Sequence, residues 1–129
     1  MINHIQIIAQ KKGNATFAHK FDAHPFTLAR YKFVAKMLTG RNHVLEVGCA
    51  DAFGTRLVVQ EVNNLTATDF DPLFVRDVLL RMDKRWAFEC RQHDMLASPF
   101  PGSFDAAYAL DVIEHIPQLV STCGRTYLY

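Results

Sequence analysis

The residues best suited to chemistry stand where short apolar runs end. After the mainly apolar run 44–47 the chain continues as Gly48-Cys49-Ala50-Asp51-Ala52, and Asp69 closes the next predicted strand, 65–68. Small residues let backbone N–H groups approach a ligand closely, and the start of a following helix adds a partial positive charge. A carboxylate such as that of Asp69 can accept two hydrogen bonds from a sugar diol. The spacing therefore predicts one ligand site built by two neighbouring strand ends.

A parallel sheet would bring these residues together. Apolar runs and turn signals predict strands at 44–47, 65–68, 86–90 and 104–110, and helices at 25–38, 53–61 and 72–82. Alternating strands and helices favour an α/β fold, a doubly wound parallel sheet with helices on both faces. Ligands of such sheets bind at the carboxyl ends of the strands, where the small residues and Asp69 should lie.

The stretch Glu46-x-Gly48-Cys49-Ala50-x-Ala52 resembles motif I of class I S-adenosylmethionine-dependent methyltransferases, E/D-x-G-x-G-x-G. Two of the usual three glycines are Ala50 and Ala52 here. The resemblance implies a Rossmann-like fold whose loop, including Glu46, Gly48, Cys49 and Ala50, wraps the methionine part of S-adenosyl-L-methionine. The dinucleotide pattern G-x-G-x-x-G matches only Gly48, which disfavours an NAD-type oxidoreductase.

Further matches follow in the family order. The resemblance assigns Asp69 to the cofactor ribose and Phe70 to the adenine ring. After the third predicted strand it assigns Asp94 to the adenine amino group and the backbone N–H of Met95 to the ring. Taken alone, an aspartate at a strand end is more often a turn residue.

The segment 104–116 resembles the family pattern F-D-x-V/A-x-x-x-x-V-x-E-H-I. By this resemblance, Leu110 and Asp111 border the methionine and sulfonium end of the cofactor. His115 would stand beside the methyl-transfer centre as a general base, because the pKa of histidine lies near neutrality. A structural role for His115 at a helix start is an equal alternative.

A complete class I core has seven strands, whereas the pattern predicts four here. We therefore expect a single incomplete domain over 1–129 with its C-terminal strands missing: an N-terminal helical segment at 1–40, a cofactor-binding half at 41–116 and an atypical tail at 117–129. The strand at 104–110 would then form an exposed edge, which predicts marginal stability or a homo-oligomer that covers it.

The composition is that of an ordinary globular chain: 129 residues, 50% hydrophobic and 21% charged, with a net charge of +1. It predicts no nucleic-acid or membrane partner. Three cysteines without a CxxC pair predict no metal site, and the setting expected is the reducing cytoplasm. The expected function is methylation of a small-molecule or other acceptor. The alternative is a truncated, inactive S-adenosylmethionine-binding or interaction module.

Overall fold

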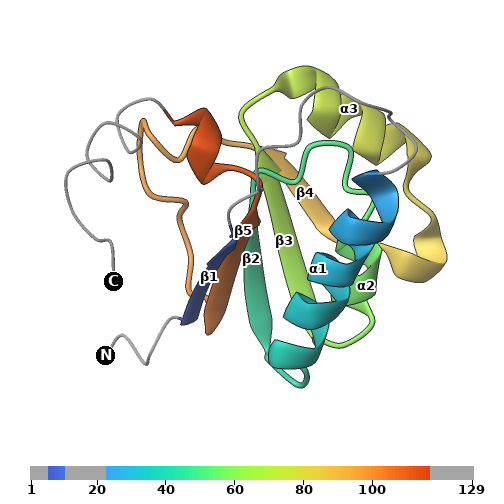
Figure 1. Cartoon of the computed structure of the whole chain (residues 1–129). Helices are drawn as coiled ribbons and strands as arrows, with labels where there is room; N and C mark the ends of the chain where they lie inside the picture. The colour runs from blue at the N-terminus through green and yellow to red at the C-terminus, as the bar shows by residue number, and fades with distance from the viewer. Residues whose placement is uncertain (1–5, 11–22, 117–129) are drawn as a thin grey trace.

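The computed structural model describes residues 6–10 and 23–116, whose strands form one parallel sheet (Figure 1). The strands lie side by side in the order β1-β5-β2-β3-β4. Their bounds are Gln6–Gln10 for β1, His43–Val47 for β2, Asn64–Asp69 for β3, Glu89–Gln92 for β4 and Ala106–Leu110 for β5. The predicted parallel, Rossmann-like α/β sheet is confirmed, and the predicted tail 117–129 lies outside the described residues.

The described α-helices all cover the same face of the sheet. They are α1 (Ala23–Met37), α2 (Thr55–Val59) and α3 (Pro72–Arg81). Two 3-10 turns also occur, η1 (Lys84–Trp86) after α3 and η2 (Ile113–His115) after β5. On this face Val44, Ala67 and Tyr108 belong to one buried core with Val34 of α1 and Val58 of α2. The expectation of helices on both faces is therefore wrong for the described part of the chain.

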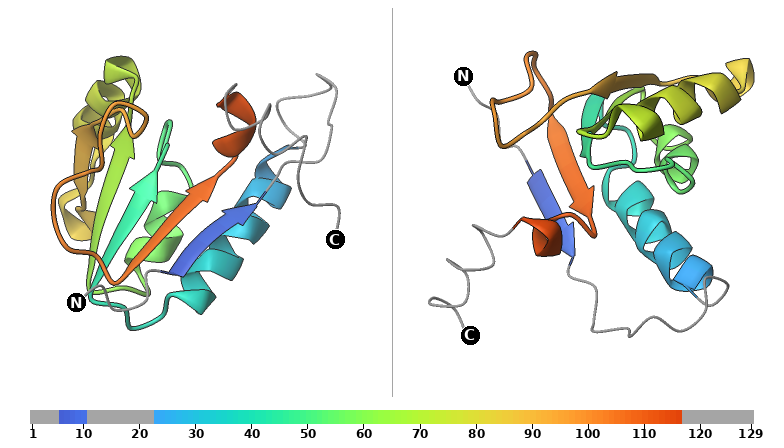
Figure 2. Two further views of the ribbon diagram at one scale, coloured as in Figure 1. Left: turned by 90° about the vertical axis from the view of Figure 1, so that its left-hand side faces the viewer. Right: turned by 90° about the horizontal axis from the view of Figure 1, so that it is seen from above.

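A loop crosses the opposite face instead. Residues 93–105 pass in front of the sheet on the side away from α1 and α2, as Figure 2 shows in orange. The Phe104 ring packs 4.4 Å from the His43 ring, and the Phe100 ring lies 5.9 Å from that of Phe104. Leu45 and Thr66, which share this face with His43, are buried. Aromatic packing from a loop thus covers strands that a helix would cover in a doubly wound sheet.

Strand β1 pairs with β5, and the sequence pattern did not indicate it. The two strands run parallel, with Ile8 opposite Tyr108. On its other side β5 pairs with β2, so its backbone groups have partners on both edges. The expectation that the strand at 104–110 forms an exposed edge is therefore wrong. The structure gives no reason to expect a homo-oligomer that covers this edge.

Element ends follow local chemistry. Asp71 caps α3, where its side chain accepts a hydrogen bond from the N–H of Leu73 and Pro72 occupies the first turn, as the sequence predicts. The third predicted strand is shifted: 84–86 forms η1, and β4 begins only at Glu89. Among the described residues, no helix is long and apolar enough to cross a membrane.

Candidate functional site

The loop after β2 places every second residue in the left-handed backbone region. The angle φ is +73° at Gly48, +48° at Ala50 and +54° at Ala52, the three positions at which motif I has glycine. An alanine in this region costs about 1–2 kcal/mol. The N–H groups of Gly48 and Cys49 both donate to the carbonyl of Thr68, at 2.8 and 2.9 Å. These bonds fold the loop back onto the end of β3.

Two glycines of this region also make room for neighbouring side chains. A Cβ on Gly48 would lie 2.4 Å from a methyl carbon of Val112. A Cβ on Gly54 would lie 2.1 Å from the ring of Tyr31. Gly54 therefore lets α1 pack closely against the loop, a role that its position after motif I did not reveal.

Asp69 ties the loop to the carboxyl end of β3. One carboxylate oxygen accepts the N–H of Ala50 at 2.8 Å, and the other accepts the N–H of Asp71 at 2.9 Å. The side chain is only 6% exposed, yet it lines a cavity at this end of the sheet. Each oxygen keeps a further lone pair, which a ligand hydroxyl can use.

This cavity has a volume of about 510 Å³, within the usual range for small-molecule sites. Eight of the predicted site residues line it: Gly48, Cys49, Ala50, Asp69, Phe70, Leu110, Asp111 and His115. Seven residues outside that predicted set complete the lining: Thr27, Tyr31, Asp51, Phe53, Gly54, Phe74 and Val112. The structure thus gathers the ends of β2, β3 and β5 around one space, and α1 closes a side of it.

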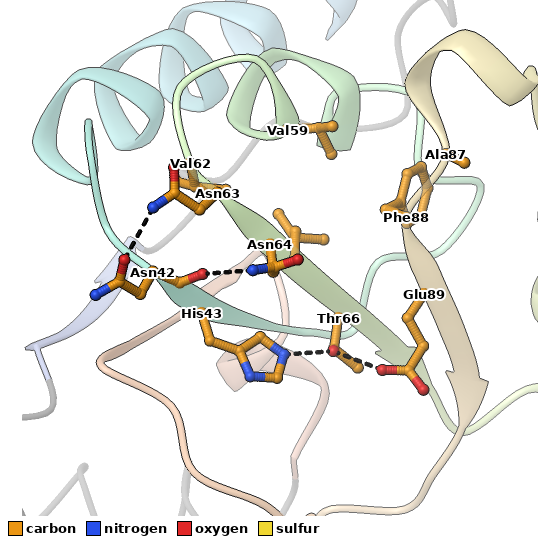
Figure 3. Close-up of a pocket in the computed structure, with 11 residues that line it drawn as sticks. Asn42, His43, Val59, Val62, Asn63, Asn64, Thr66, Ala87, Phe88 and Glu89 are labelled. Atoms are coloured by element: carbon orange, nitrogen blue, oxygen red, sulfur yellow. Dashed lines mark hydrogen bonds between the residues drawn. The ribbon is translucent and has the colours of Figure 1, made fainter.

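A second hollow, of about 560 Å³, lies at the opposite ends of the strands (Figure 3). On its floor His43 Nε2 lies 3.0 Å from Thr66 Oγ1, and Thr66 donates to Glu89 at 2.9 Å, so the three side chains link β2, β3 and β4. Amide side chains on its rim bond to each other or to backbone, as Asn63 does to Asn42. These groups satisfy one another, and the hollow lies away from the loop that the motifs form, so the carboxyl-end cavity is the candidate site.

Glu46 lies beneath the cavity rather than in its wall. Tyr31 donates to one carboxylate oxygen at 2.7 Å and Thr55 to the other at 2.6 Å. Burial raises the pKa of Glu46, and these hydrogen bonds oppose the rise. Burial and the Glu46 charge likewise raise the pKa of Tyr31 well above its ordinary value. Glu46 thereby fixes α1 and α2 against β2, so it supports the loop instead of touching the cavity.

Arg30 and Asp111 form the main ion pair at the cavity wall. The guanidinium donates to both carboxylate oxygens, at 2.6 and 2.7 Å, and the two side chains are 18% and 22% exposed. Asp111 has φ of +57°, a backbone conformation that the pair helps to hold. Arg30 carried no signal in the sequence, because its partner stands 81 positions away.

Two predicted cofactor residues do not reach the cavity. Asp94 and Met95 are exposed in the turn after β4 and do not belong to the lining. The Asp94 carboxylate accepts the N–H of Leu96 at 2.9 Å, and its carbonyl accepts the N–H of Ala97. In this structure Asp94 has the turn role that a strand-end aspartate commonly plays.

Cys49 is a buried wall residue without the features of a nucleophile. Its hydrogen bond with the Cys90 thiol and its burial raise its pKa well above the ordinary value, whereas the same contact lowers the pKa of Cys90. Both cysteines are free thiols. His115 is exposed in η2, where its N–H donates to the carbonyl of Val112. Among the described residues no cluster of His, Cys, Asp and Glu side chains could hold a metal ion.

The donor set of the cavity fits S-adenosylmethionine. The folded loop brings small residues to the cavity wall, Asp69 has the lone pairs that a ribose diol requires, and Phe70 offers an exposed aromatic face. Asp111 and Leu110 form the wall at the end of β5. Nothing in this arrangement requires a metal ion.

Solved structures with this fold bind the same kind of cofactor. The N-methyltransferase NodS from Bradyrhizobium japonicum, in complex with S-adenosylhomocysteine, matches with a TM-score of 0.51 and 22% identity, over 70% of this chain and 45% of that chain. Coclaurine N-methyltransferase, bound to N-methylheliamine and S-adenosylhomocysteine, matches with a TM-score of 0.60 and 18% identity, over 92% of this chain and 36% of that chain. At these identities the likeness shows the fold.

Comparison of sequences also points to methyltransferases that use this cofactor. A probable S-adenosylmethionine-dependent methyltransferase of Mycolicibacterium smegmatis is 30% identical over 99 residues, 74% of this chain and 37% of the relative. The chain thus spans less than half the length of these relatives. The profile of the methyltransferase domain matches residues 45–126, more than half of the chain. S-adenosylmethionine is accordingly the cofactor that fits the cavity, and the chain belongs to the methyltransferase domain family.

Proposed function

We propose that this chain is the cofactor-binding part of an S-adenosylmethionine-dependent methyltransferase that methylates a small-molecule acceptor. The observation that carries the proposal is the loop at 48–52, whose three left-handed residues fold onto Asp69 at the carboxyl ends of β2 and β3. A plain strand-to-helix connection would not need this strained backbone.

Each side chain of the cavity has its own role in the proposed reaction. When bound, the cofactor supplies a methyl group on a positively charged sulfur. Asp69 accepts hydrogen bonds from the ribose hydroxyls, and Phe70 covers a face of the adenine ring. Asp111, fixed by Arg30, shapes the wall beside the reacting sulfur. His115 takes up the proton that the acceptor releases. The protein then accelerates the reaction chiefly by positioning the reactants and excluding water.

The test is a calorimetric titration of the folded chain with S-adenosylhomocysteine. We expect micromolar affinity, about −8 kcal/mol. In Asp69→Asn, the amide nitrogen replaces an acceptor oxygen, so affinity should fall at least about tenfold for one lost charge-assisted hydrogen bond. Asp83→Asn makes the same change on an exposed turn and should bind like the wild type. Equal affinity of Asp69→Asn and wild type would contradict the proposal.

Transfer is tested separately, with cofactor that carries a labelled methyl group. Label in an acceptor supports the enzyme, and loss of transfer in His115→Ala with unchanged cofactor affinity supports the role of His115. Cofactor binding without transfer to any acceptor favours the second candidate, an S-adenosylmethionine-binding module.

We place the protein in the cytoplasm. Cys49 and Cys90 are adjacent free thiols in the core, and free thiol pairs are typical of reducing compartments. A sample purified without reductant, checked for free thiols by labelling after unfolding, tests this placement.

A further inference from the structure

The lining of the cavity carries an excess of negative charge. Asp51, Asp69 and Asp111 line it, and among the described residues no Lys or Arg does. Arg30 neutralises Asp111 through two hydrogen bonds. Asp69 is assigned to the cofactor ribose, so Asp51 is the lining carboxylate left for a second ligand. S-adenosylmethionine itself brings a net charge of about +1, because its sulfonium, ammonium and carboxylate groups are all ionised.

Arg81, which contacts the backbone of Asp51, is also engaged. Arg81 donates to the backbone carbonyl of Asp51 at 2.9 Å, and its guanidinium pairs with Asp77 at 2.7 Å. Within the described part of the chain, the Asp51 carboxylate accepts the N–H of Phe53 at 3.1 Å. Asp51 is thus an exposed lining carboxylate with no Lys or Arg on its side-chain oxygens within the described residues.

Aromatic faces stand beside these carboxylates. Phe53 and Phe74 line the cavity and are 53% and 41% exposed, and neither is assigned to the cofactor, unlike Phe70. The face of an aromatic ring is negative and attracts cations within about 6 Å. Rings and carboxylates together favour a ligand that is apolar in one part and cationic in another, and they disfavour carboxylates and phosphates.

We infer that the methyl acceptor is an amine on an apolar or aromatic body; this inference rests on the proposed function. The acceptor nitrogen first releases a proton to His115 or water. Its lone pair then bonds to the methyl carbon as the bond from that carbon to sulfur breaks, and the bonding pair stays on sulfur. The positive charge passes from sulfur to nitrogen, so Asp51 shares the cavity with a cation before and after transfer. A hydroxyl acceptor would end uncharged, without this stabilisation.

The experiment compares phenethylamine with hydrocinnamate, which share the ring and linker and carry opposite charges. Each is titrated calorimetrically into the full chain saturated with S-adenosylhomocysteine, and phenethyl alcohol serves as the neutral reference. We expect the amine to bind at least about tenfold more tightly than the carboxylate. At a separation of a few ångströms, the Asp51 carboxylate attracts the ammonium group of the amine and repels the carboxylate group of hydrocinnamate. Labelled methyl transfer to phenethylamine is the second readout.

Two variants connect the preference to named residues. Asp51→Asn should lower the ratio of amine to carboxylate affinity about fivefold. Asp83→Asn, on an exposed turn away from the cavity, should leave the ratio unchanged. Phe74→Leu keeps an apolar side chain but removes the ring face, so it should weaken the amine more than the alcohol.

The outcomes separate the two proposals. Binding of S-adenosylhomocysteine with no preference for the amine, or with no binding of either probe, overturns the inference and leaves the proposed function in place. A folded chain that does not bind S-adenosylhomocysteine overturns both. An amine preference that Asp51→Asn and Asp83→Asn change equally overturns the assignment to this cavity.

Discussion

Arg30 binds Asp111 through two parallel hydrogen bonds, from Nη1 to Oδ1 at 2.6 Å and from Nη2 to Oδ2 at 2.7 Å. The pair joins α1 to the end of β5 at the wall of the cavity, across 81 positions of the sequence. It also holds Asp111 at φ of +57°. One contact therefore links the position of the first helix to the shape of the site where methyl transfer is proposed.

Asp111→Asn tests the electrostatic part of this contact. Asparagine tolerates the left-handed backbone, so the change removes charge without adding strain. The pair is mostly shielded from water, and we expect the free energy of unfolding to fall by about 1–2 kcal/mol. Urea denaturation of Asp111→Asn, of Arg30→Gln and of the double variant gives the coupling free energy between the two side chains. The double variant should lose less than the sum of the single losses, and simple additivity would show that the pair contributes nothing.

Ala50→Gly and Ala52→Gly test the strain in the cofactor loop. Glycine removes the cost of φ near +50°, although it also gives the unfolded chain more freedom. The net gain in unfolding free energy should be about 0–1 kcal/mol for each variant. Ala29→Gly, on the exposed side of α1, is the control and should lose about 1 kcal/mol. If the two loop variants lost as much unfolding free energy as Ala29→Gly, the backbone at Ala50 and Ala52 would not be strained.

Glu46→Gln tests the buried carboxyl through pH. Burial raises the pKa of Glu46 in the folded protein, so its contribution to stability is complete below the unfolded pKa and is lost as pH rises through the folded pKa. Glutamine does not ionise, so its contribution to stability does not change with pH in this way. The variant should therefore gain stability relative to wild type as pH rises from about 4 upward, measured by urea midpoints.

Glu61→Gln is the control of opposite sign. Hydrogen bonds from Lys36 and Thr39 lower the pKa of this partly exposed glutamate, so its contribution is present above the unfolded pKa and is lost as pH falls. That variant should lose stability relative to wild type as pH rises. Parallel pH trends in the two variants would exclude the proposed cause for Glu46.

Proline in β1 tests whether this strand completes the sheet. In a parallel pair, alternate residues direct their N–H groups toward the neighbouring strand. One of Ile7→Pro and Ile8→Pro should therefore remove a hydrogen bond to β5 and lower the unfolding free energy by about 1–3 kcal/mol. The other should be nearly neutral and serves as its control. Sedimentation should show self-association only for the disruptive variant, and two neutral variants would mean that β1 is dispensable.

The sequence alone determined the strands β2, β3 and β5, the helices α1 and α3, and the cavity residues that follow the strands. Each of these depends on a local pattern: an apolar run, a small-residue turn, a cap such as Asp71 before Pro72. The carboxyl ends of parallel strands meet at one edge, so locating the strands was enough to gather Gly48 and Asp69.

Tertiary structure decided the rest, because the deciding partners lie far apart along the chain. The segment Gln6–Gln10 becomes a strand through pairing with β5, and no local signal marks that pairing. Glu46 points away from the cavity because Tyr31 and Thr55 offer it buried hydrogen bonds from two helices. Side-chain type and spacing specify which groups are available at a site, whereas packing between distant elements determines which of them face the ligand.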